Sequence, residues 1–296
     1  MELETIGIIS PGEMGSAVGR YLINDDHRVI TCLTGRSERT KQFSIAAGIQ
    51  NVPTLHELVI ESDLILSIMV PSESKHLAES VSDALRATGE NTYFADCNAV
   101  SPKTSMAIGS IISKSGGRYI DAGIIGGPPT ELTSPRFYVS GPHHQAMKEL
   151  DRSGIQIKPL GDEIGRASAI KMCYASLTKG TWALYIALLT TAELLGLSDE
   201  LKEEFAFSQP QTLRTMESRL ASIPSKAERW IGEMDEIAST FADQGVTPFF
   251  HRGSAEIYRL IGRSRFASEL VGNADESRNL SETIRALSDL INYEHS

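Results

Sequence analysis

The 296-residue sequence has little of what marks secreted proteins and metal-binding proteins. It contains only three cysteines, Cys32, Cys97 and Cys173, which lie far apart in apolar surroundings. This spacing predicts buried free thiols in a reducing cytosol, and it argues against a disulfide framework or a zinc site. The N-terminus has no basic segment of the kind that opens a signal peptide. We therefore expect a cytoplasmic protein.

Positive charge and long apolar runs are also scarce. The chain has 28 Lys and Arg against 38 Asp and Glu, a formal net charge of −10, so we expect no nucleic acid partner. The most apolar run, residues 182–189, is too short to span a bilayer, and Glu193 soon follows it. His143 and His144 have no third ligand at metal spacing and are expected to begin a surface helix. The sequence thus predicts a globular protein without a membrane segment or a metal.

Strand and helix signals alternate over the first ~160 residues, the pattern of a doubly wound parallel sheet with crossover helices. Strands are expected at residues 4–10, 28–34, 63–70, 92–96, 119–123, 137–140 and 156–159, and helices at 13–24, 37–47, 55–62, 72–87 and 102–115. After Gly161 the strand signals stop and a long helix is expected over 164–195. Further helix starts are expected at Ser198, Ser208, Pro224, Pro248 and Asn279. We predict a Rossmann-like α/β domain over residues 1–161 and an all-helical domain over 162–296, with a ligand cleft between them.

The turn from the first strand into the first helix carries a phosphate-binding pattern. Gly12 and Gly15 occupy the second and third positions of the dinucleotide fingerprint G-x-G-x-x-G, and Ser10 replaces the first glycine. Serine is expected to fit if its φ stays negative, while the second glycine admits a pyrophosphate and the third lets helix and strand pack closely. The alternative is a strand-turn-helix without a ligand. The predicted cofactor contacts here are Ser10, Pro11, Gly12, Glu13 and Met14.

The end of the second strand indicates which cofactor this turn would bind. NAD sites usually place Asp or Glu there, whereas this chain offers Thr34, Arg36, Ser37 and Arg39. A guanidinium can donate two parallel hydrogen bonds to phosphate oxygens, so the pattern favours NADP over NAD, with NAD possible. The alternative is that both arginines are merely solvated at a helix N-terminus, although the helix dipole disfavours cations there.

Further motifs follow in order along the chain. They are residues 67–71 (Ser-Ile-Met-Val-Pro), 96–102 (Asp-Cys-Asn-Ala-Val-Ser-Pro), 121–127 (Asp-Ala-Gly-Ile-Ile-Gly-Gly) and 161–165 (Gly-Asp-Glu-Ile-Gly), with Lys171 soon after. Together with the first turn they resemble the β-hydroxyacid dehydrogenase superfamily, which includes 3-hydroxyisobutyrate and 6-phosphogluconate dehydrogenases. Residues 171–175, 178–180, 229–234 and 249–252 resemble a poorly characterised 6-phosphogluconate dehydrogenase-like branch with a shorter helical C-terminal domain.

The resemblance implies roles for particular residues. It makes Lys171 the general acid/base, because alcohol oxidation needs a group that removes the hydroxyl proton, and a partly buried amine can do so. The alternative is a surface lysine that packs only its stem. The resemblance also implies that Met14, Met69, Val70 and Pro71 wall the nicotinamide, with ordinary packing as the alternative.

The sequence departs from the family pattern where family members contact the substrate. Tyr174 and Ala175 stand where an asparagine is common, Ile125 replaces the serine of Ser-Gly-Gly, and Asn98 falls in an Asp-x-Ser/Thr element. A pocket without these donors should lose specificity for the family carboxylates, so we doubt 3-hydroxyisobutyrate or 6-phosphogluconate as substrate. The predicted substrate contacts are Asn98, Ile125, Gly126, Gly127 and Tyr174, and Asn98 could also contact the nicotinamide.

These patterns predict an NADP-preferring oxidoreductase that moves a hydride between nicotinamide and a small hydroxyacid-like or related carbonyl substrate. We expect a homodimer formed through the helical domain, because its apolar surface would otherwise be exposed. An imine reductase of the same architecture is one alternative. That group usually has Asp or Tyr in place of Lys171, so Lys171 argues against this alternative and Tyr174 argues for it. A non-catalytic NADP-binding protein is the other. For His251 and Arg252, anion binding is weighed against a solvated helix face.

Overall fold

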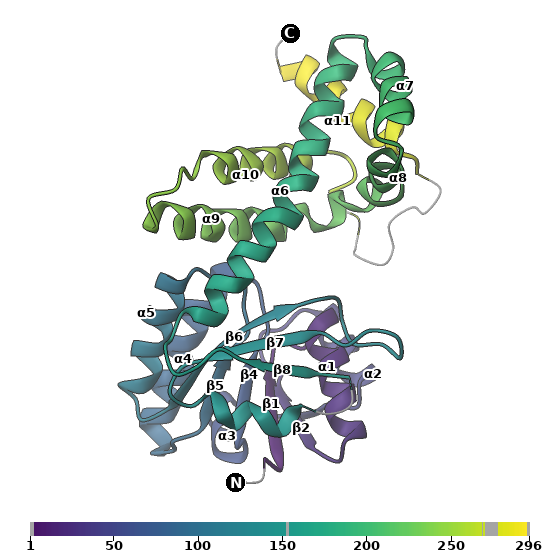
Figure 1. Cartoon of the computed structure of the whole chain (residues 1–296). Helices are drawn as coiled ribbons and strands as arrows, with labels where there is room; N and C mark the ends of the chain where they lie inside the picture. Colours follow the sequence, from purple (N-terminus) through teal and green to yellow (C-terminus); the bar gives the residue numbers. More distant parts are fainter. Residues whose placement is uncertain (1–2, 152–153, 268, 270–277, 295–296) are drawn as a thin grey trace. The chain divides into compact units, whose positions relative to one another are not determined.

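The computed structural model describes residues 3–151, 154–267, 269 and 278–294. It divides into two compact units, Met1–Tyr174 and Ala175–Ser296 (Figure 1). The first unit holds the sheet, and the second holds helices. The first unit runs past residue 161 because the first turns of the following helix pack against the sheet. The domain boundary after residue 161 stays a prediction.

The first unit is built on an eight-stranded sheet with the order β3-β2-β1-β4-β5-β6-β7-β8. Neighbouring strands are parallel except β6 and β7, which are antiparallel. This confirms the doubly wound α/β fold, with an antiparallel pair that the alternation of elements did not predict. The strands are β1 (Thr5–Ile9), β2 (Arg28–Cys32), β3 (Gln50–Val52), β4 (Leu64–Ser67), β5 (Tyr93–Asp96), β6 (Arg118–Ile125), β7 (Arg136–Ser140) and β8 (Gln156–Pro159).

Helices cover both faces of the sheet, and an apolar core lies on each face (Figure 1). The helices of this unit are α1 (Glu13–Asn24), α2 (Glu38–Ala46), α3 (Leu55–Glu61), α4 (Pro71–Thr88), α5 (Pro102–Ser113) and the 3₁₀ helix η1 (His144–Leu150). Their starts follow from local chemistry. Ser101 caps α5 by accepting a hydrogen bond from the Thr104 N–H, with Pro102 in the first turn. The predicted surface helix at His143 and His144 is wrong in one respect, because the His144 side chain is buried.

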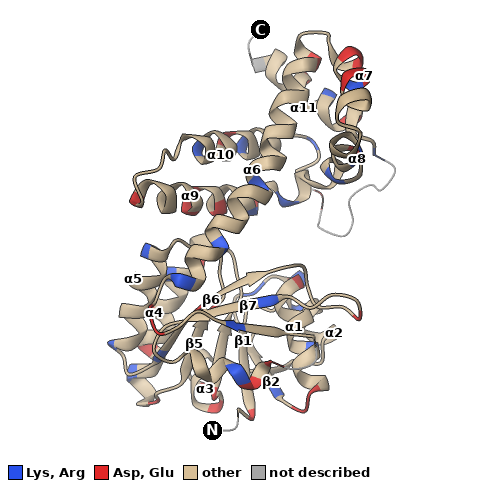
Figure 2. Ribbon diagram, viewed as in Figure 1, with Lys and Arg blue, Asp and Glu red and all other residues tan. Residues whose placement is uncertain are grey.

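Long helix α6 (Arg166–Leu194) begins in the first unit and continues into the second. The described residues of the second unit form helices joined by turns and no strand, which confirms the all-helical C-terminal region. Its other elements are α7 (Ser198–Ser208), α8 (Pro210–Arg219), η2 (Leu220–Ser222), η3 (Pro224–Lys226), α9 (Ala227–Asp243), α10 (Phe249–Gly262) and α11 (Leu280–Glu294). Acidic side chains gather on α7 (Figure 2).

The core of the second unit centres on a buried ion pair between α6 and α9. Lys179 Nζ lies 2.6 Å from Glu233 Oε2, and the Tyr258 hydroxyl of α10 donates a 2.6 Å hydrogen bond to the Lys179 carbonyl. Burial, and then the charge of Glu233, raise the pKa of Tyr258, so this hydroxyl stays a donor. The Trp230 ring packs edge-on against Tyr258 at 5.3 Å. These contacts hold the middle of α6 against α9 and α10.

The prediction of three buried thiols is wrong for Cys173, which is exposed, and Cys32 is only half-buried. On a helix, neighbours in sequence lie on different faces, so the buried Met172 does not imply a buried Cys173. Cys97 is buried, and burial followed by the charges of Asp96 and Asp121 raises its pKa. Among the described helices, none is long and apolar enough to cross a membrane.

Candidate cofactor and active site

The first turn of the sheet unit has the geometry of an anion site. The N–H of Gly12 donates a 2.7 Å hydrogen bond to the Ser10 carbonyl, and the helical pattern of α1 begins with the Ser16 N–H bonded to the Gly12 carbonyl. Gly12 caps α1 without a side-chain hydrogen bond. The first backbone N–H groups of a helix have no partner within it. Those of Glu13 and Met14 are therefore available to hold phosphate oxygens.

Ser10 corrects one expectation about this turn. Its φ is +62°, in the left-handed region, whereas the turn was predicted to keep φ negative. The fingerprint uses glycine at this position because a Cβ in the left-handed region costs about 1–2 kcal/mol. Ser10 therefore adopts the left-handed backbone conformation for which the fingerprint uses glycine.

The two fingerprint glycines have different surroundings. A Cβ on Gly15 would lie 3.3 Å from both Ile8 Cγ2 and the Ser10 carbonyl oxygen, a tight contact, so close packing of α1 on β1 favours glycine. A Cβ on Gly12 would meet only the Ser10 carbonyl oxygen, at 4.0 Å. The space above Gly12 is therefore open for a ligand that approaches the backbone.

A pocket of about 490 Å³ lies at the carboxyl ends of β1, β2 and β4, where open α/β sheets bind ligands. It brings together three predicted cofactor contacts, Thr34, Arg36 and Met69. The Nε of Arg36 is buried and has no hydrogen-bond partner in the described part of the chain. The Ser37 hydroxyl instead caps α2 by accepting from the Thr40 N–H. Arg39 lies over the Phe43 ring at 5.3 Å and does not line the pocket.

Asn98 ties together the ends of β4 and β5. Only 2% of the residue is exposed. Its Oδ1 accepts a 2.6 Å hydrogen bond from the Met69 N–H, and its Nδ2 donates to the Ser67 hydroxyl at 2.8 Å and to Asp96. The amide therefore fixes the start of residues 69–71, the predicted nicotinamide wall of Met69, Val70 and Pro71. A direct contact between Asn98 and substrate or nicotinamide stays a prediction that these bonds disfavour.

Lys171 projects from the first turns of α6 toward the end of β6. Its Nζ donates a 2.6 Å hydrogen bond to the Ile124 carbonyl, just before the predicted contacts Ile125, Gly126 and Gly127. Gly126, with φ +123°, and Gly127 are both exposed. Tyr174 follows one turn after Lys171 with 45% of its surface exposed. The Lys171 amine thus lies against the strand end that leads into the two exposed glycines.

Close approach of α6 to β6 requires Gly123. A Cβ at this position would lie 2.7 Å from the Ala167 carbonyl oxygen and 3.0 Å from Lys171 Cβ. Real Cβ atoms rarely tolerate such contacts with a backbone atom. The glycine therefore allows the lysine stem to lie directly on the strand.

Asp121 on β6 positions this helix, and the sequence patterns did not assign it a role. Its carboxylate is completely buried and caps the N-terminus of α6. It accepts hydrogen bonds from the backbone N–H groups of Gly165, Ala167 and Ser168 and from the hydroxyls of Ser105, Ser140 and Ser168. Ser168, on the helix face that carries Lys171, is thus bonded to this carboxylate. The signal in the sequence was one acidic residue inside an otherwise apolar strand, which demands buried donors.

His251 and Arg252 lie on α10 of the second unit. His251 is buried against the Phe241 ring at a centroid distance of 4.3 Å, and burial lowers its pKa. A neutral imidazole attracts anions weakly, so its environment disfavours the anion-binding hypothesis. Arg252 lies over the Phe249 ring.

Comparison with known families gives two matches. Residues 5–152 match the family described as the NAD binding domain of 6-phosphogluconate dehydrogenase. Residues 192–261 match a domain of unknown function, DUF1932. An uncharacterised 28.5 kDa protein of Methanothermus fervidus is 30% identical over 198 residues, which span 67% of this chain and 74% of that protein. The mitochondrial 3-hydroxyisobutyrate dehydrogenase of Drosophila melanogaster is 27% identical over 66% of this chain and 58% of that enzyme.

Solved structures share the fold along most of the chain. A conserved protein of unknown function, described as similar to 3-hydroxyacid dehydrogenases, is 28% identical with a TM-score of 0.60 over 87% of this chain and 99% of that one. The 3-hydroxyisobutyrate dehydrogenase of Mycobacterium tuberculosis is 19% identical with a TM-score of 0.64, over 97% and 99% of the two chains. An imine reductase of Myxococcus stipitatus in complex with NAD⁺ is 17% identical with a TM-score of 0.54, over 96% and 100%.

The Asp121 cap predicts the effect of a single change. Asp121→Asn keeps the volume but turns an NH₂ group toward donors, so we expect a loss of about 2–3 kcal/mol in the free energy of unfolding. Urea unfolding would measure it. Asp83→Asn is the control, because Asp83 pairs with Arg86 on the surface of α4, and we expect a change below about 0.5 kcal/mol. Equal losses in the two variants would contradict the role of Asp121.

Proposed function

The chain belongs to the family of NAD(P)-binding 6-phosphogluconate dehydrogenase-like and 3-hydroxyisobutyrate dehydrogenase-like proteins, and on that premise we propose that it is an NADP-preferring oxidoreductase. It moves a hydride between nicotinamide and a small hydroxyacid-like or related carbonyl substrate. The observation that carries the proposal is the Lys171 amine, held at the carboxyl end of β6 by the Ile124 carbonyl. The same sheet edge carries the phosphate turn and the pocket around Arg36.

Lys171 is the proposed general acid/base. When bound, the nicotinamide supplies or accepts the hydride. Lys171 in its amine form takes the hydroxyl proton as the substrate is oxidised, and its ammonium returns a proton during reduction. The Ile124 carbonyl accepts a hydrogen bond from Lys171, so it orients the Nζ at the end of β6.

The residues near Lys171 favour a substrate other than the carboxylates of the named relatives. Ile125 stands in the sequence where a family serine would donate a hydrogen bond, and its apolar side chain is buried. Gly126 and Gly127 offer exposed backbone instead. Tyr174 adds a phenol that can orient a carbonyl or hydroxyl oxygen. Fewer donors for a carboxylate favour a less polar carbonyl compound, or a hydroxyacid held through backbone N–H groups.

Two alternatives remain distinct from this proposal. An imine reductase would use Tyr174 as its proton donor. The similarity in fold to a solved imine reductase supports this alternative. A non-catalytic NADP-binding protein would use the phosphate turn and the Arg36 pocket without needing Lys171. The Lys171 and Tyr174 variants below separate these three functions.

NADP preference rests on Arg36. Its Nε is a buried donor with no protein partner in the described residues, at the end of β2. This strand end lies beside the expected ribose, where a 2′-phosphate would accept charge-assisted hydrogen bonds. No carboxylate follows β2 directly to accept ribose hydroxyls.

We propose that the protein works as a cytosolic homodimer through its helical unit. A groove of about 510 Å³ between α6 and α10 is lined largely by apolar side chains. Leu177, Leu184 and Phe250 around it are 70%, 61% and 80% exposed. Exposed apolar side chains grouped in this way are typical of an interface. The same face of a second copy is the proposed occupant.

Lys171→Met should lower turnover roughly 10²–10⁴-fold while leaving NADP affinity intact, because it removes the acid/base and keeps the stem. The assay is NADPH absorbance across hydroxyacids, aldehydes, ketoacids and imines. Lys114→Met, at the exposed end of α5, is the control and should keep full activity. If Tyr174→Phe abolishes imine reduction while Lys171→Met leaves it unchanged, the imine reductase assignment is correct instead. If no substrate class is turned over, the non-catalytic alternative is favoured.

Arg36→Ala should weaken NADP binding about 10–100-fold and leave NAD binding nearly unchanged, because only NADP carries the 2′-phosphate. Calorimetric titration of both cofactors measures this. Arg39→Ala is the matched control, since Arg39 packs on Phe43 outside the pocket. Wild-type protein that binds NAD more tightly than NADP would disprove the preference.

Leu184→Glu should convert the dimer into a monomer, because it places a charge in the apolar groove. Light scattering after gel filtration reports the mass. Leu132→Glu in the first unit, where Leu132 is 95% exposed, should leave the dimer intact. A wild-type monomer at micromolar concentration would rule out the proposed interface.

A further inference from the structure

One face of α4 lines the same pocket as Arg36. Glu73, His76, Leu77 and Ser80 all border it, and they lie at positions i, i+3, i+4 and i+7 of the helix. Arg36 approaches from the loop after β2, so the pocket has a second wall that the sequence patterns did not include. The helix thus presents an acid, an imidazole and an apolar side chain to the proposed adenosine end of the cofactor.

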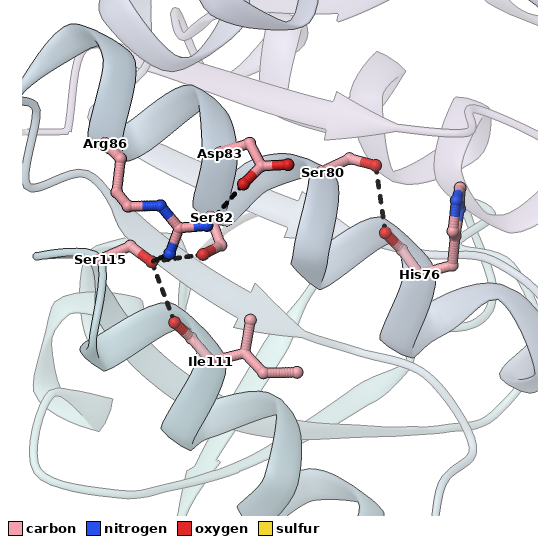
Figure 3. Close-up of polar contacts among 7 residues, drawn as sticks. All are labelled: His76, Ser80, Ser82, Asp83, Arg86, Ile111 and Ser115. Carbon is pink, nitrogen blue, oxygen red and sulfur yellow. Dashed lines mark hydrogen bonds and ion pairs between the residues drawn. The ribbon is translucent and has the colours of Figure 1, made fainter.

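The other face of α4 is fixed to α5, which steadies this wall (Figure 3). The Ser82 and Ser115 hydroxyls are hydrogen-bonded to each other, and Arg86 donates to Ser115 at 3.2 Å. On the pocket side, the Ser80 hydroxyl donates to the His76 backbone carbonyl at 3.1 Å (Figure 3). Ser80 therefore bonds within the helix, and Glu73 and His76 are the polar side chains left to meet a ligand.

Three polar groups of the pocket lack partners within the described residues. Within the described residues, the Glu73 carboxylate and the His76 imidazole form no hydrogen bond or ion pair, and the Nε of Arg36 is an unpartnered buried donor. Arg36 and Glu73 border one pocket without forming a salt bridge. Apolar side chains of the lining come from Ile9, Leu55, Met69 and Leu77. The pocket thus offers a flat ring apolar side chains, a carboxylate, an imidazole and an N–H donor.

We propose that Glu73 and His76 recognise the adenine base of the cofactor, an inference that rests on the proposed function. Glu73 accepts a hydrogen bond from the exocyclic 6-amino group, and His76 donates to the ring nitrogen N7. These two edge groups of adenine are a donor and an acceptor side by side, which matches a carboxylate and an imidazole one helical turn apart. Arg36 would hold the 2′-phosphate, since its Nε is the unpartnered buried donor of the pocket within the described residues.

The proposal distinguishes adenine from hypoxanthine, whose 6-oxo group is an acceptor. The probe is the hypoxanthine analogue of NADP, compared with NADP by calorimetric titration. Wild-type protein should prefer NADP by about fivefold to tenfold, because both side chains are partly solvated. Glu73→Gln should abolish this preference, since an amide can donate to the 6-oxo group as well as accept from the amine. Glu79→Gln, on α4 outside the pocket lining, is the matched control and should retain it.

His76→Ala gives an independent measurement, because N7 is present in both bases. It should weaken NADP and its hypoxanthine analogue by the same factor, about threefold to tenfold. Equal binding of the two bases by wild-type protein, or a preference that survives Glu73→Gln, would overturn the proposal. So would a gain in NADP affinity without a gain in NAD affinity in Glu73→Gln, which would place the carboxylate beside the phosphate.

The proposal can fail while the proposed function stands. If Arg36→Ala weakens NADP but Glu73→Gln changes nothing, the cofactor occupies the pocket and only the base recognition is wrong. If neither change affects NADP binding, the cofactor lies elsewhere and both proposals fail.

Discussion

The buried carboxylate of Asp121 is the contact on which the geometry of the site depends. Burying a charge without a cation is costly unless many donors replace water. Here backbone N–H groups at the start of α6 and hydroxyls from neighbouring elements supply them. The helix dipole adds positive potential at the same point. The cap therefore fixes the start of α6 on β6, and the rest of the lysine geometry follows from that attachment.

Lys171 reaches the strand end because two features of β6 act together. Asp121 sets where α6 begins, and Gly123, two residues later, lets the helix backbone lie against the strand. One helical turn separates Ala167, bonded to Asp121, from Lys171, so a shift of the cap would carry the amine with it. Asn98 positions the cofactor side of the site, because its amide accepts a hydrogen bond from the Met69 N–H at the end of β4. Buried polar contacts thus position both halves of the site on rigid strands.

The sequence predicted the fold well because its signals are local. Apolar runs and caps such as Ser101 depend on neighbouring residues, and the predicted helices were confirmed to within a few residues. The short strand β3 was missed because two of its three residues are exposed and leave no apolar pattern. The sequence did not indicate roles for Asp121, Glu73 and His76, because the groups that surround them come from distant parts of the chain. The left-handed φ of Ser10 likewise follows from the turn as a whole and not from serine itself.

The two halves of the candidate site differ in how far they keep the family pattern. On the cofactor side, the turn at Gly12 keeps its helix N-terminus, and the Ser10 substitution leaves its backbone shape intact. On the substrate side, Ile125 and Tyr174 exchange small donors for an apolar side chain and a large phenol. Such an exchange changes which substrate oxygen is held while the Lys171 amine stays at the same carbonyl. Because the amine is positioned by main-chain contacts, the fold can keep its proposed proton transfer while the surrounding side chains select a different substrate.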